Sequence, residues 1–140
     1  MRLDKITRQV FIEVNGEEYG LKLTLSGLQQ LEKTTGNIMT MINNQPLPSL
    51  TTLATAFWIG LSGSFRMRRD EAEAILSDYM AEYGMGGNTG DNEGAVTVFY
   101  AMIAACGILG KKASNDILRQ FGLGDEKSAE PEKNAGTAAE

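Results

Sequence analysis

The chain has no histidine and only one cysteine among its 140 residues. Without histidine it lacks the side chain most often used as a general base near neutral pH and as a metal ligand, and no Ser-His or Cys-His pair can form. Cys106 lies in the apolar run AMIAACGILG and has no partner for an intramolecular disulfide. We expect it to act as a small core side chain in a reducing cytoplasm. The sequence therefore predicts no catalytic residue, no metal site and no bound cofactor.

The glycine-rich and acidic segments predict neither a phosphate-binding loop nor a catalytic site. The segment GMGGNTGDN at 84–92 matches neither the dinucleotide-binding nor the P-loop pattern, and GLSGS at 60–64 lacks the spacing of a nucleophile elbow. Glu71, Asp78 and Glu82 are expected to form the solvated face of one helix, because no second acidic cluster converges on them from elsewhere in the sequence. An enzyme has no positive support here.

Basic residues are also scarce, at 13 against 18 acids, which gives a net charge of −5. Residues 124–140 hold five acids and two lysines, so −3, and residues 1–123 carry the remaining −2. A protein that binds nucleic acid usually presents a basic face. The one dense basic cluster, Arg66, Arg68 and Arg69, is followed at once by Asp70 and Glu71. We interpret it as a solvated loop and expect no nucleic-acid partner.

No segment looks suited to a membrane. The N-terminal residues MRLDKITRQVFIEV carry charges and no apolar core of a signal peptide. Residues 94–110 are free of charge, but such a run of 17 is at the lower limit of the ~17–25 residues that span a bilayer. Its glycines, threonine and alanines also weaken its transfer into lipid. We predict that this run is the buried central helix of a small bundle, with no membrane partner.

A β-hairpin is the clearest predicted element. Apolar residues alternate with others on both sides of Asn15-Gly16, the dipeptide that best suits a two-residue type I′ turn. This turn would place Ile12 opposite Tyr19 and Phe11 opposite Gly20, with the apolar side chains on one face. A lone hairpin is marginal in water, so that face should lie on helices or on a partner strand.

Helical periodicity and capping signals follow the hairpin. The predicted segments are a helix capped by Ser26 with Gln29 and ended by Gly36, a short turn over 39–42, a helix over 50–61 capped by Ser49, a helix over 71–83 capped by Asp70 with Glu73 and ended by Gly84, a central helix over 93–109, and a short last helix capped by Ser114.

These elements predict a mainly α protein with a small N-terminal β-hairpin, an α+β fold with a compact bundle of about four to five helices. Residues 1–123 should form a single globular domain, with the hairpin at 8–24 and the bundle at 26–123. Residues 124–140 have no large apolar side chain, so they cannot offset their ordering entropy and are predicted to be a disordered acidic tail.

Taken in order, the segments over residues 8–110 resemble the tail-assembly chaperone family of long-tailed bacteriophages, in the branch found in gene transfer agents and related prophages. The loop at 84–92 is longer than that family leads us to expect. The segments that carry the resemblance are VNGEEYGLKLT, LSGLQQLEKTTG, SLTTLATAFWIGLSGSF, RRDEAEAILSDYM and GAVTVFYAMIAACGILG.

The resemblance implies a non-enzymatic protein of the host bacterial cytoplasm. Such chaperones coat the tape-measure protein before the tail tube is built around it, recruit tail-tube subunits, and are not retained in the mature virion. Many are made in two lengths by ribosomal frameshifting. The implied partners are therefore the tape-measure protein and the tail-tube protein, and formation of a homo-oligomer is left open.

A chaperone should expose apolar side chains to its partners, and flexible methionines suit such surfaces. The alternative is that the same side chains complete the core of the domain. The candidates are Met39, Met41, Ile42 and Leu47 in the proline-bounded segment, with Phe65 and Met67 in the arginine loop.

Two other classes of function remain open. A structural virion component, such as a tail-tube or head–tail connector subunit, could use the hairpin edge to extend a neighbour's sheet, although a tube wall needs more strand than one hairpin. A DNA-binding regulator would need a basic recognition helix, whereas the predicted helix over 71–83 has no basic residue and the last helix has only Arg119.

Overall fold

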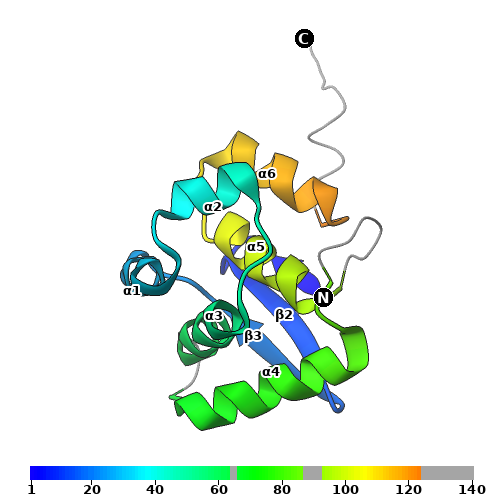
Figure 1. The fold of residues 1–140 in the computed structure, drawn as a ribbon. Helices are drawn as coiled ribbons and strands as arrows, with labels where there is room; N and C mark the ends of the chain where they lie inside the picture. Colours follow the sequence, from blue (N-terminus) through cyan, green and yellow to red (C-terminus); the bar gives the residue numbers. More distant parts are fainter. Residues whose placement is uncertain (64–65, 87–92, 124–140) are drawn as a thin grey trace.

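A computed structural model describes residues 1–63, 66–86 and 93–123 of the chain. The predictions made for Phe65, for most of the 84–92 loop and for the tail at 124–140 fall outside the described residues. Within them the protein has six helices and a three-stranded antiparallel sheet (Figure 1). The prediction of a mainly α fold with a small N-terminal β element is confirmed.

The sheet contains the predicted hairpin and one strand more. Strands β2 (Gln9–Val14) and β3 (Glu17–Leu21) pair with Ile12 opposite Tyr19 and Phe11 opposite Gly20, as the turn predicts. Asn15 and Gly16 have φ values of 52° and 81°, in the positive region that a type I′ turn requires. The additional strand, β1 (Arg2–Asp4), pairs with the outer edge of β2. The sequence gives it little signal because it is only three residues long.

The helices occur where periodicity placed them, with small shifts at their ends. Both Gly36 and Gly84 end helices with positive φ, as predicted. The helices are α1 (Leu25–Thr35), α2 (Ile38–Asn44), α3 (Leu50–Ser62), α4 (Arg69–Tyr83), α5 (Ala95–Ala105) and α6 (Lys111–Gln120).

Three predicted N-caps are wrong and one is right. Ser49 caps α3 by accepting a hydrogen bond from the Thr52 N–H at 3.1 Å, as expected. Helix α1 instead uses Thr24, whose hydroxyl accepts from Gly27, so Ser26 already lies inside the helix. Helix α4 begins at Arg69, where the Glu71 carboxylate accepts from the Arg68 N–H at 3.0 Å, so Asp70 is not the cap. In α1, Thr24 and Ser26 are both acceptable caps within three residues, whereas Arg68 before α4 is not a preferred capping residue and gives no capping signal in the sequence.

Helix α6 also begins earlier than predicted, at Lys111, and Ser114 lies in its second turn. The Ser114 side chain faces the core, and its Oγ is buried without a hydrogen-bond partner among the described residues. Serine is a strong capping signal in sequence, but here the position of the helix follows from burying Ile117 and Leu118. The predicted cap at Ser114 is therefore wrong because capping rules consider only the local sequence and not which side chains the helix must bury.

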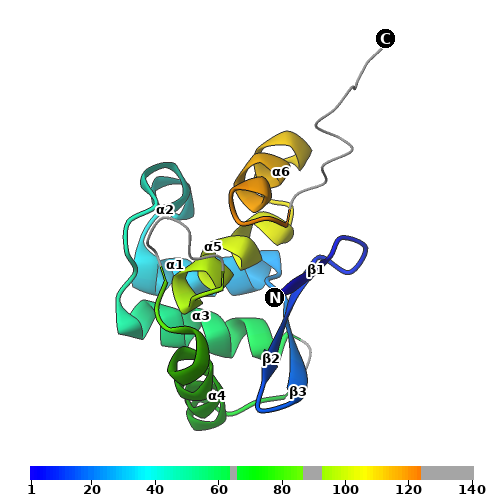
Figure 2. The ribbon, with the colours of Figure 1, turned by 90° about the vertical axis from the view of Figure 1, so that its right-hand side faces the viewer.

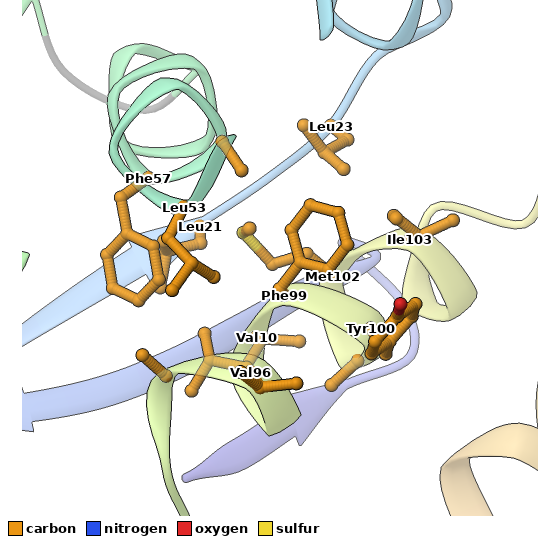
Figure 3. Packing of buried hydrophobic residues seen from close by; sticks show 14 of the residues in the cluster. Val10, Leu21, Leu23, Leu53, Phe57, Val96, Phe99, Tyr100, Met102 and Ile103 are labelled. Atoms are coloured by element: carbon orange, nitrogen blue, oxygen red, sulfur yellow. The ribbon is translucent and has the colours of Figure 1, made fainter. Parts of the chain in front are cut away.

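Helix α5 is the centre of the core. Every residue from Ala95 to Ala104 is buried, and the helix packs against β2, α3, α4 and α6. Figure 3 shows Val96, Phe99 and Met102 of α5 pointing among side chains of the sheet and of α3. The prediction of a buried central helix is confirmed, although the helix is shorter than the predicted 93–109.

Figures 1 and 2 show α4 across one end of the molecule and α6 at the opposite end, with α5 and the sheet between them. The apolar face of the sheet is covered because β2 contacts α4 and α5, and β3 contacts α3. The Lys22 N–H donates to the Gly60 carbonyl at 3.0 Å, so the end of the hairpin is tied directly to the last turn of α3. The hairpin is therefore covered by helices of its own chain.

Candidate protein-binding surfaces

The structure separates the predicted binding residues into exposed and buried ones. Met39 and Leu47 are 47% and 66% exposed, so both are accessible to a partner. Met41 and Ile42 lie in the core, at 9% and 7% exposure, and are not accessible in this conformation. For these two residues the alternative interpretation is correct, since their side chains complete the core. Periodicity could have separated them, because Ile38, Met41 and Ile42 lie at helical spacing on one face.

Met67 is half-buried beside the core. Its backbone carbonyl accepts a hydrogen bond from the Trp58 indole N–H at 3.0 Å, which holds the residues before α4 against α3. The neighbouring Phe65 lies outside the described residues. The arginine loop therefore offers little apolar surface in the part of it that the structure describes.

Two of the three arginines in the basic cluster, Arg68 and Arg69, form ion pairs within the protein. Arg68 bonds to Asp70 at 3.1 Å, and this hydrogen bond lowers the pKa of the Asp70 carboxyl. Arg69 bonds to Glu73 at 3.2 Å, and its guanidinium lies 5.5 Å from the centre of the Trp58 ring. Arg66 and Arg68 are exposed, which agrees with the interpretation of a solvated loop, and exposed pairs of this kind add little stability.

The segment that carries Met39 and Leu47 is held at both ends. Asn37 caps α2, and the Glu32 carboxylate of α1 accepts from the Ile38 N–H at 2.9 Å. At the far end the Tyr100 hydroxyl donates to the Pro46 carbonyl. The ring of Tyr100 is buried, and this burial raises the pKa of its phenol to about 12. The exposed side chains thus project from an anchored segment rather than from an open loop.

A second group of exposed apolar residues was not found from the sequence. Ile6 (93% exposed), Leu25 (66%) and Ile108 (46%) line one groove of about 520 Å³. The three residues lie in the β1–β2 turn, the first turn of α1 and the α5–α6 turn, so only the fold brings them together. The signal in the sequence is a large apolar residue inside a polar turn, as in DKIT, but it does not identify the neighbours.

Local bonds fix the shape of this groove. The Asp4 carboxylate accepts hydrogen bonds from the N–H groups of Ile6 and Thr7 at 3.0 and 3.3 Å, and the bonds with Thr7 chiefly lower the pKa of Asp4. Cys106 also lines the groove, and its thiol donates to the Ile103 carbonyl. Burial raises the pKa of that thiol, so it stays protonated near neutral pH and is a poor nucleophile. The groove therefore suits apolar contact better than thiol chemistry.

No group of three or more Asp, Glu or Cys side chains that could hold a metal ion occurs in residues 1–63, 66–86 and 93–123. None of the helices in the described part of the chain has both the length and the apolar character needed to cross a bilayer. Compared with models of protein families, with curated proteins and with solved structures, the chain gives no match in any of the three.

Proposed function

We propose that this protein is a non-enzymatic tail-assembly chaperone of a long-tailed phage or prophage. It binds the tape-measure protein and tail-tube subunits while the tail is being assembled. The proposal rests on the resemblance of the ordered segments over residues 8–110 to that family, and one structural observation supports it. The observation is that large apolar side chains stay exposed around a formed groove while the core is filled by others.

The exposed groups differ from ordinary surface residues in their arrangement. Single exposed apolar side chains are common and need no explanation, whereas several around one concave surface are typical of protein-binding sites. Ile6, Leu25 and Ile108 meet this description. Met39 and Leu47 are also exposed and do not line that groove. A long helical partner with apolar residues along one side could be held by such surfaces.

The test is co-expression of the full chain with the products of its neighbouring genes, followed by affinity purification and light scattering. We expect a very long helical protein to co-purify with the chain and to be soluble only in its presence. Assembly of the chain alone into rings or tubes, with no such partner, would instead indicate a structural virion subunit.

Two double variants identify the surface that binds. Ile6→Ser with Leu25→Ser removes apolar surface from the groove, and Met39→Ser with Leu47→Ser removes it from the α2–α3 segment. All four side chains are exposed, so the fold should be retained. We expect at least one double variant to lose most of the co-purified partner, while the control Thr51→Ser keeps it. Full retention by both would contradict binding through these surfaces.

A further inference from the structure

A basic cleft lies next to the apolar groove and shares Arg8 and Gly107 with it. The cleft has a volume of about 890 Å³, with an apolar floor that includes Leu3 and Leu118. Five basic residues and one acidic residue line it among those that the structure describes. They are Lys5, Arg8, Lys111, Lys112 and Arg119, with Asp116 as the acid.

The positive charge of this cleft is only partly neutralised. Asp116 lies 3.5 Å from the Lys112 ammonium and 3.4 Å from the Arg119 guanidinium, so one carboxylate serves two cations. Among the described residues, no carboxylate forms an ion pair with Arg8 or Lys111. The start of α6 has no side-chain cap, so the partial positive charge of its N-terminus adds to that of the lysines. Residues 1–123 carry −2 overall, so this cleft is a local exception.

The chain leaves the described region beside the cleft. After α6 ends at Gln120, Gly122 takes a φ of 78° and turns the backbone. The Leu123 N–H then donates to the Leu118 carbonyl at 2.9 Å. Leu118 and Arg119 both line the cleft, so Leu123, which precedes segment 124–140 in the sequence, is bonded to a residue of its lining.

The residues that follow are acidic and long enough to reach the whole cleft. Asp125 and Glu126 come two and three residues after Leu123, and Glu130 and Glu132 follow. An extended chain covers ~3.3 Å per residue, so the later acids can pass the full length of α6, which is about 15 Å. Tethering also gives such a segment an effective concentration on the order of millimolar, so weak charge contacts become populated.

We propose that the acidic segment 124–140 of the same chain binds in this cleft. Its carboxylates lie against the lysines at the start of α6 and against Arg8, in the manner of an acidic peptide on a basic groove. Contacts of this kind between exposed charges are weakened by salt. The proposal depends on the charge and position of the cleft and does not depend on the proposed chaperone function.

Carbodiimide cross-linking of the full chain tests it. The reagent joins a carboxylate to a lysine amine as an amide with loss of water, and peptide mapping by mass spectrometry locates the link. We expect links from Lys111 or Lys112 to acids at 125–132 within single chains, unchanged by dilution and reduced severalfold at about 1 M salt. Lys33, an exposed lysine of α1, is the internal control and should give severalfold fewer such links.

A second measurement does not require the lysines as reactants. In nuclear magnetic resonance spectra of the full chain, Lys112→Glu should shift the backbone amide signals of residues 125–132, whereas the matched variant Lys33→Glu should leave them in place. Equal links to all exposed lysines, with no shift in Lys112→Glu, would overturn the proposal. Links found only between chains would overturn it as well. They would show that the cleft binds the acidic segment of a second copy of the protein.

Discussion

At the scale of single residues, two glycines let backbone segments approach closely. A Cβ added at Gly94 would overlap the backbone Cα and N atoms of Gly86, closer than real atoms come. The start of α5 is held in the same place, where the N–H groups of Ala95 and Val96 donate to the carbonyls of Gly84 and Met85. The first turn of the central helix is thus satisfied by backbone instead of by a capping side chain.

We predict that Gly94→Ala lowers the free energy of unfolding by about 3 kcal/mol or more, because backbone atoms must move to admit the methyl group. Gly60→Ala is the matched control. Its added Cβ would lie 2.9 Å from Met102 Sδ and 3.2 Å from Leu21 Cβ, so it meets side chains where Gly94 meets backbone. Alanine also favours a helix interior by about 1 kcal/mol, which offsets that contact. Chemical denaturation of both variants measures the difference, and equal losses would contradict the backbone argument.

At the scale of elements, sequence patterns predicted whether a segment is a helix or a strand. They did not predict which other segments it packs against. The Asn15-Gly16 turn and its register were predictable because hairpin pairing is local. Membership of the groove was not, since Ile6, Leu25 and Ile108 come from three distant turns. The caps at Thr24, Arg68 and Gly110 were missed for a related reason, because burial of apolar faces decides between adjacent starting points.

The candidate binding residues show the same limit. Met39 and Met41 are two residues apart in one short helix, yet one is exposed and the other lies in the core. Methionine content alone predicts that a segment is adaptable, whereas accessibility depends on which side of the helix faces the rest of the molecule. The helical spacing of Ile38, Met41 and Ile42 does indicate one buried face, so methionine content located the segment and periodicity was needed to select among its side chains.

The α2–α3 segment gives a prediction that depends on pH. Tyr100 is neutral in the fold with a phenol pKa of about 12, against about 10 when unfolded. The contribution of the neutral phenol to the free energy of unfolding is therefore fully present below about pH 10 and is lost as the pH rises through about 12. We predict that Tyr100→Phe costs about 1 kcal/mol at neutral pH, from the bond to Pro46, but that wild type loses more stability than the variant between about pH 10 and 12.

Urea denaturation of both proteins at several pH values checks this expectation. All other ionisable groups are common to both proteins, so their effects on stability cancel in the difference. A gap between wild type and Tyr100→Phe that stays constant up to about pH 12 would show that this phenol does not ionise on unfolding as argued.

At the scale of the whole molecule, one cluster of buried side chains connects the sheet with all six described helices. Val10 and Ile12 of β2, Phe57 of α3 and Phe99 of α5 belong to it, as does Leu118 near the end of α6. Figure 3 shows how side chains of α3, α5 and the sheet meet within it. No element within the described residues has a separate apolar core, so partial unfolding would expose part of this cluster to water.

A single core predicts one cooperative unfolding transition. The only tryptophan, Trp58, lies on α3, where its indole bonds to the Met67 carbonyl, and it reports tertiary structure at the α3–α4 contact. Far-ultraviolet circular dichroism reports the helices of the whole chain. We expect the two signals to give the same urea midpoint and the same slope. An earlier fluorescence transition would mean that α3 and α4 separate while α5 and α6 stay folded, and the 1–123 region would then contain two units rather than the one domain predicted.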